Sequence, residues 1–153
     1  MLGMICAEIR NWFTYDCDKH IGDYEIIGGV ITPSFDFKTD YVRIIGSRKN
    51  DGVYKVADIA DPERNPLVDE GQFHGAVWEM SVPKDFIALC DEIAEWQSQY
   101  GGANGIINSP FSSESFGGYS YTKSSGRSNE SSNGSAPNWQ SIYASRLNVY
   151  RKI

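Results

Sequence analysis

The side chains that could do chemistry are few and lie far apart in the sequence. His20 and His74 are the only histidines of the 153 residues, and neither has a second ligand at the spacing that metal sites use. Asp91, Glu92 and Glu95 are close enough in sequence to act as a paired acid and base. Nothing apolar surrounds them that would shift a carboxyl pKa, so the pattern favours a solvated helix face.

The serine-rich stretches contain neither a GxSxG nucleophile motif nor a GxxxxGK[ST] phosphate loop. We therefore predict no catalytic residue, no metal ligand and no cofactor, and we expect that the protein is not an enzyme.

The three cysteines, Cys6, Cys17 and Cys90, form no CxxC pair. Cys6 and Cys90 lie on apolar helix faces, which predicts buried free thiols.

Two amphipathic helices are predicted in the first hundred residues. The clearer one covers residues 83–100, with Pro83 suited to a first helical turn and Gly101 to a helix end. Its apolar positions recur at helical spacing: Phe86, Ile87, Leu89, Cys90, Ile93, Trp96 and Tyr100. Residues 2–13 show the same period over a shorter length, so this helix must pack on another element.

Between these helices the period changes to two, which predicts strands. Segments 24–32, 34–38, 41–47 and 53–56 alternate, and Asn50-Asp51-Gly52 marks a hairpin. Gly22-Asp23 predicts a turn, and Gly28-Gly29 predicts a bulge or a close approach of another backbone. Residues 57–72 predict a loop and residues 73–82 a further strand.

The predicted fold class is therefore α+β. It is a small helical body with two main helices and an inserted antiparallel β subdomain, followed by an extended C-terminal arm that ends in a short helix. The expected domains are a body of residues 1–102 and an arm of residues 103–153.

The arm is rich in aromatic and basic side chains. Residues 124–138 are almost free of apolar side chains and predict a linker, whereas residues 138–153 are amphipathic again. The final segment either folds back on the body or docks on another molecule, and its composition favours an intermolecular contact. The predicted partner-binding residues are Phe111, Phe116, Tyr119, Tyr121, Trp139, Tyr143, Arg146, Leu147, Tyr150, Arg151 and Lys152.

Charge divides the chain in the same place. Residues 123–153 carry five basic side chains against one acidic, a net of +4, so the net charge of -6 leaves -10 on the other 122 residues. An acidic body argues against ordinary nucleic-acid binding and suits a surface that DNA passes without adhering. The apolar runs are too short for a membrane span or a signal peptide, which predicts a soluble protein made in the cytosol.

Residues 76–153 resemble the head-tail connector proteins, also called adaptor or neck proteins, of tailed bacteriophages and prophages. The most specific part is FSSESFGGYSYTK, residues 111–123, between the helix of residues 83–100 and the basic, aromatic C-terminal end. The strands of residues 24–56 depart from the mostly helical body of that family.

The resemblance implies a structural protein of the virion neck, assembled in the host cytoplasm. It implies a homo-oligomeric ring, commonly of twelve subunits, whose arms bind the portal protein above. A stopper or tail protein would lie below, and DNA would cross the channel without sequence-specific binding. The alternatives are another neck or tail ring component, such as a stopper or tail terminator, or a small hydrolase or ligand-binding domain.

Overall fold

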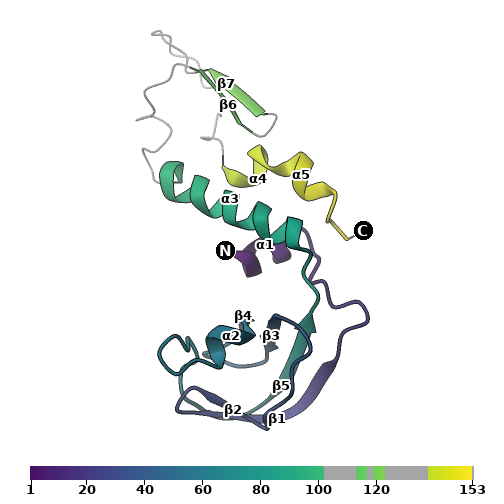
Figure 1. Ribbon diagram of the computed structural model, residues 1–153, viewed down its shortest axis with the longest axis vertical. Helices are drawn as coiled ribbons and strands as arrows, with labels where there is room; N and C mark the ends of the chain where they lie inside the picture. The colour runs from purple at the N-terminus through teal and green to yellow at the C-terminus, as the bar shows by residue number, and fades with distance from the viewer. Residues whose placement is uncertain (102–112, 117–118, 123–137, 153) are drawn as a thin grey trace. The chain divides into compact units, whose positions relative to one another are not determined.

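The computed structural model describes residues 1–101, 113–116, 119–122 and 138–152, with residues 113–116 and 119–122 described as backbone alone. The chain divides into two compact units, Leu2–Lys84 and Asp85–Ile153. The fold class is α+β, as predicted (Figure 1). The division falls before the long helix and not after it, because the last helices of the chain pack with that helix.

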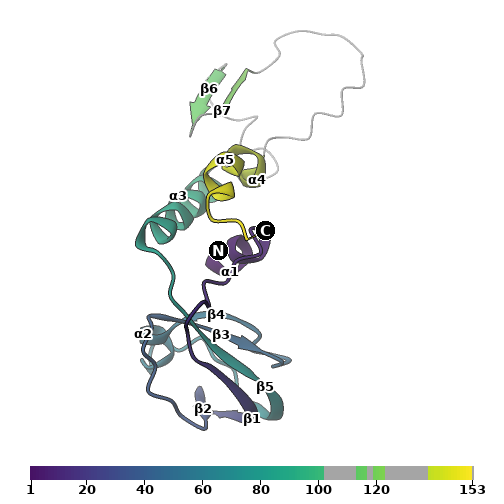
Figure 2. The ribbon, with the colours of Figure 1, turned by 90° about the vertical axis from the view of Figure 1, so that its right-hand side faces the viewer.

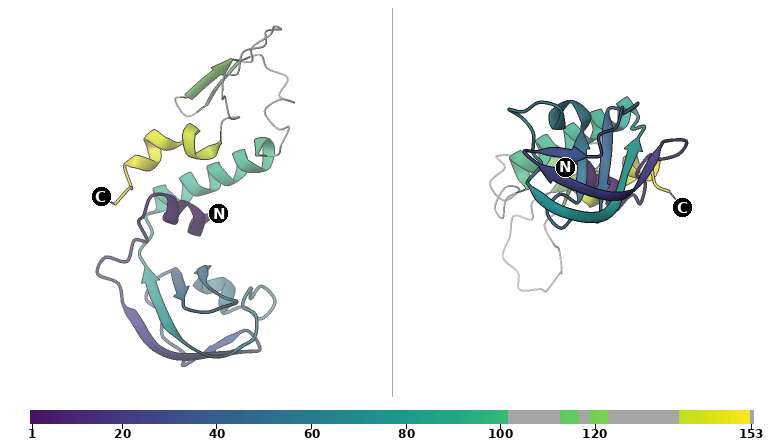
Figure 3. Two further views of the ribbon diagram at one scale, coloured as in Figure 1. Left: turned by 180° about the vertical axis from the view of Figure 1, so that it is seen from behind. Right: turned by 90° about the horizontal axis from the view of Figure 1, so that it is seen from below.

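The first unit contains a five-stranded antiparallel sheet in the order β2-β1-β5-β3-β4. Its strands are β1 (Lys19–Ile27), β2 (Val30–Thr32), β3 (Tyr41–Ile45), β4 (Gly52–Lys55) and β5 (Glu70–Met80). The sheet curls into a half-barrel, and the short helix α2 (Val56–Ile59) lies on its concave side (Figures 1 and 3).

The longest strand pair joins β1 to β5 and corrects one turn prediction. Gly22 pairs with Gly75 and Asp23 with His74, so the predicted turn at residues 22–23 is wrong. The long β5 offers a continuous partner that overrides the local turn signal. A Cβ on Gly75 would lie 2.2 Å from the Ile45 carbonyl oxygen, so the close approach of β3 to β5 requires glycine there.

The segment predicted as one strand over residues 24–32 is a hairpin. Gly28 and Gly29 have φ angles of 58° and 73°, the two positive values that a tight type I′ connection needs. They therefore form the β1–β2 turn and not the bulge that we predicted. Residues 34–38, predicted as a strand, form a loop that places Phe35 and Phe37 against the core of the sheet.

The hairpin predicted around residues 50–52 is confirmed, since β3 pairs antiparallel with β4. Side chains along β1 and β3 alternate between buried and more exposed positions, and the buried ones pack with Leu67 in the core of the sheet. The buried core residues of the sheet are Tyr24, Ile26, Ile31, Val42, Ile44, Leu67 and Val77.

The first helix, α1 (Leu2–Glu8), is shorter than the predicted residues 2–13. Positive φ angles at Arg10 and Phe13, 55° and 51°, end the helical path. The chain then brings the Trp12 ring to 3.5 Å from the Arg43 guanidinium, measured from ring centroid to carbon. This cation–π contact ties the segment after α1 to strand β3.

The second unit is built on α3 (Lys84–Tyr100), which confirms the predicted long helix. Five of its predicted apolar positions are buried: Phe86, Leu89, Cys90, Ile93 and Trp96. The helices α4 (Trp139–Ile142) and α5 (Ala144–Asn148) lie alongside α3 (Figures 1 and 2). The Asn138 side chain caps α4 by accepting a hydrogen bond from the Ser141 amide, 2.9 Å away.

Strands β6 (Ser113–Phe116) and β7 (Tyr119–Thr122) form a separate two-stranded antiparallel sheet. The predicted linker of residues 124–138 lies outside the described residues apart from Asn138. Across the described ranges, no helix combines the length and the apolar character needed to cross a membrane.

Candidate functional site

The C-terminal helices pack inside this chain and do not expose their apolar side chains. Trp139 is 6% exposed, Tyr143 0% and Leu147 1%. We predicted these three residues as partner-binding, and their burial corrects that prediction. Helical periodicity shows which face must be buried, but it does not show what covers the face.

Three contacts show that α3 covers them. Both terminal nitrogens of Arg146 lie 2.8 Å from carboxylate oxygens of Glu92, a bidentate pair. The hydrogen bond that Arg146 donates to Glu92 raises the pKa of Arg146 above its ordinary value. Burial raises the pKa of Tyr143, and the nearby charge of Glu92 raises it further.

The ring of Tyr150 extends the same contact, with its centroid 4.9 Å from that of Phe86 on α3. Arg146 and Tyr150, which we also predicted as partner-binding, therefore have partners in their own unit. Val149, 80% exposed, and the side chains of Arg151 and Lys152 are among the exposed ones of residues 138–152. Arg151 donates from Nε to the Asn148 side chain over 3.1 Å. Of the predicted C-terminal set, Arg151 and Lys152 keep an exposed position.

The remaining predicted partner residues belong to the segment between α3 and α4. Phe111 lies outside the described residues, and Phe116, Tyr119 and Tyr121 belong to β6 and β7, of which the backbone is described. Because α3 and α4 belong to one compact unit, both ends of the segment of residues 101–137 are attached to that unit.

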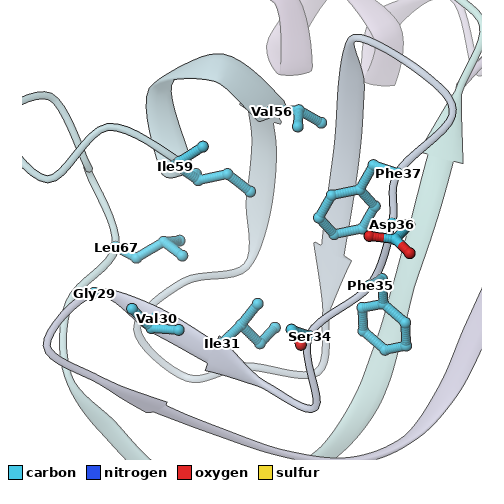
Figure 4. Close-up of a pocket in the computed structure, with 11 residues that line it drawn as sticks. Gly29, Val30, Ile31, Ser34, Phe35, Asp36, Phe37, Val56, Ile59 and Leu67 are labelled. Atoms are coloured by element: carbon cyan, nitrogen blue, oxygen red, sulfur yellow. The ribbon is translucent and has the colours of Figure 1, made fainter.

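The sheet unit contains an apolar groove of about 440 Å³ on its concave side (Figure 4). It is lined by Gly29, Val30, Ile31, Ser34, Phe35, Asp36, Phe37, Val56, Ile59, Ala60 and Leu67. We did not predict this groove from the sequence, because we predicted Phe35 and Phe37 in a strand and residues 57–72 as a loop. The alternating pair of phenylalanines before a polar loop was the signal available.

A carboxylate organises the turn between β3 and β4. Glu70 accepts hydrogen bonds from the Ser47 hydroxyl, from the backbone amides of Arg48 and Lys49, at 2.9 and 3.2 Å, and from the Asn50 side chain at 3.2 Å. These donors, the Ser47 hydroxyl first, hold the pKa of Glu70 below its ordinary value. The cluster satisfies the backbone of a sharp turn, so its role is structural.

Replacing Glu70 with glutamine is expected to destabilise the protein more at neutral pH than in acid. Because the folded pKa is depressed, the stabilisation is complete above the ordinary value of 4.5 and is lost as the pH falls through the folded pKa. Urea unfolding at pH 7 and about pH 3 measures the difference in unfolding free energy between wild type and Glu70→Gln. Ser47→Ala removes the main hydrogen-bond donor to Glu70, so the difference in unfolding free energy between wild type and this variant should also be smaller in acid. A gap for Glu70→Gln that stays equal at both pH values would contradict this assignment.

Both histidines have carboxylate neighbours. His20 Nε2 lies 3.3 Å from Glu79, whose other oxygen accepts a 2.8 Å hydrogen bond from the Lys38 amide. His74 Nδ1 lies 2.8 Å from Asp23 on the paired strand. Glu79 is 1% exposed, so its contacts fasten the loop before β3. In the part of the chain that the structure describes, no group of three or more potential ligands is arranged for a metal.

The thiol predictions are confirmed for Cys6 and Cys90, which are free and buried, while Cys17 is partly exposed. Burial raises the pKa of Cys6 to about 12, which makes this thiol unreactive at neutral pH.

Comparison of this chain with protein-family models, with curated proteins and with solved structures finds no match.

Proposed function

We propose that this protein is a ring-forming head-tail connector of a phage neck, which docks on the portal protein and forms part of the DNA conduit. The observation that carries the proposal is the segment of residues 111–123, the most specific part of the resemblance. It contains strands β6 and β7, and the helices on either side of it in the sequence, α3 and α4, belong to one compact unit.

A segment whose two ends are attached to one unit suits a ring subunit. Fixing both ends of a segment lowers the conformational entropy cost of placing it on a partner. A two-stranded sheet by itself is marginally stable in water, so β6–β7 gains most from adding to another sheet or surface. The ring would comprise about twelve subunits, the number that the family resemblance implies.

The charge distribution supports a conduit. Residues 2–84 contain fourteen acidic and nine basic side chains, a net of -5. A negative surface gives DNA no phosphate contacts to hold it, so DNA slides past. The exposed cations Arg151 and Lys152 are the C-terminal residues proposed for portal contacts, together with strands β6 and β7.

The half-barrel favours a second candidate, a stopper or tail-terminator ring, because it departs from the mostly helical body of connectors. Binding to purified portal separates the two functions. Sedimentation of the portal with full-length protein is expected to give a direct complex, weakened by Arg151→Glu combined with Lys152→Glu. The pair Arg48→Glu and Arg64→Glu, at exposed positions of the other unit, is the control for added negative charge. Binding that requires a third neck protein would contradict the connector function and support the second candidate.

A further inference from the structure

The groove of the sheet unit is built as a receptor for apolar side chains. Ile31 and Leu67, 8% and 7% exposed, are its most buried lining residues. Phe35, Phe37 and Ile59 also line it and remain partly exposed, so part of their apolar surface is still in water. At about 440 Å³ the groove is within the range of about 300–1,000 Å³ that ligand sites occupy.

The margin of the groove is acidic. Residues 56–70 supply four of the lining residues, and the same segment contains five carboxylates and one cation, a net of -4. Its charged residues are Asp58, Asp61, Glu63, Arg64, Asp69 and Glu70. Asp36 adds a carboxylate directly to the lining. The groove therefore suits a peptide segment with apolar or aromatic side chains that has basic residues next to them in its sequence.

The β6–β7 hairpin of this chain has that chemistry. Phe116, Tyr119 and Tyr121 lie within six residues, Glu114 is the only charged residue of the hairpin, and Lys123 and Arg127 follow it, a net of +1 over residues 113–127. In the described residues each of its strands pairs with the other alone, which leaves both outer backbone edges open. An aromatic segment that is followed by positive charge thus suits an apolar groove with an acidic margin.

We propose that the β6–β7 hairpin of one copy docks its aromatic side chains in the groove of the neighbouring copy. The inference rests on the proposed ring and names the contact that closes it. Donor and acceptor are different surfaces of one chain, so the contact is head-to-tail, and its repetition gives a ring when the rotation between neighbouring copies closes. Each added subunit then binds two neighbours, and a modest single contact gives a stable assembly.

Photo-crosslinking of the full-length protein tests the proposal. A benzophenone amino acid replaces Tyr121, and unlabelled and ¹⁵N-labelled copies are mixed before assembly. The expected products join residue 121 to peptides containing residues 29–37 or 56–67, with mixed-isotope pairs in the proportion that random mixing gives. Products joined only within one copy, or joined elsewhere on the surface, would overturn the proposal.

Two alanines of the same short helix region provide matched variants. Ala57 and Ala60 are both exposed, but Ala60 lines the groove and Ala57 does not. Ala60→Arg places a bulky cation where the hairpin must enter, so we expect the yield of intermolecular crosslinks to fall about tenfold or more. Ala57→Arg adds the same charge and is expected to leave the yield unchanged. Equal yields in the two variants would overturn the proposal, and circular dichroism checks that both remain folded.

Portal binding, measured on the same samples, separates this contact from the connector function. If rings bind portal but give no crosslink to the groove, the connector function stands and the hairpin contact is rejected. If the copies crosslink through the groove but do not bind portal, the hairpin contact stands and the connector function is rejected.

Discussion

Replacing Leu147 with alanine is expected to lower the free energy of unfolding of the Asp85–Ile153 unit by about 2–5 kcal/mol. Leu147 is 1% exposed, so truncation removes buried methyl groups and leaves a cavity. The neighbouring Tyr143 and Trp139 are also buried, which limits collapse around that cavity. Urea unfolding followed by tryptophan fluorescence measures the change, and hydrogen exchange of the α3 amides assigns it to this unit.

Val149→Ala is the matched control two residues away. Val149 is 80% exposed, so its truncation is expected to change stability by less than about 0.5 kcal/mol. Similar small effects for both variants would mean that the C-terminal helices do not pack on α3 in solution. The earlier hypothesis, in which this segment docks on a partner, would then regain its support.

Replacing Asn50 with alanine is expected to destabilise the sheet unit by about 2–4 kcal/mol. The side chain is 1% exposed and bonds to both backbone groups of Val68, donating to the carbonyl over 2.9 Å and accepting from the amide over 2.8 Å. Its amide also donates to Glu70 over 3.2 Å. Truncation leaves the part-buried backbone groups of Val68 and the Glu70 carboxylate without these hydrogen bonds, and a polar group that loses its partner away from water costs free energy.

Thermal and urea unfolding of Asn50→Ala measure this effect. Arg48→Ala serves as the control because Arg48 joins the same cluster through its backbone amide, while its side chain is exposed. The control should stay within about 0.5 kcal/mol of wild type. If Asn50→Ala were as stable as Arg48→Ala, the Val68 backbone would have found other partners, and the network would not be structural.

Local sequence patterns predicted the elements better than they predicted the contacts. The α3 helix, the β3–β4 hairpin and the buried thiols of Cys6 and Cys90 follow from periodicity and turn chemistry. The strand predicted over residues 24–32 was wrong because two adjacent glycines fit either a bulge or a tight turn. The pairing partner decides between them, and pairing is not a local property.

The site could be predicted only in part for the same reason. The sequence shows that Trp139, Tyr143 and Leu147 need a cover, and the polar stretch before them suggested that the cover is another molecule. The Arg146–Glu92 ion pair joins residues 54 positions apart, and no periodic pattern reports such a contact. The groove depends on a loop and a short helix that converge across the sheet, so the sequence offered only the alternating Phe35 and Phe37 as a signal for it.

Negative-stain imaging of the full-length protein at high concentration shows directly whether this chain assembles into a closed ring. We expect rings with a central hole and about twelve-fold symmetry, formed by the protein alone or on addition of purified portal. Uniform monomeric particles at every concentration, both with and without portal, would contradict the claim.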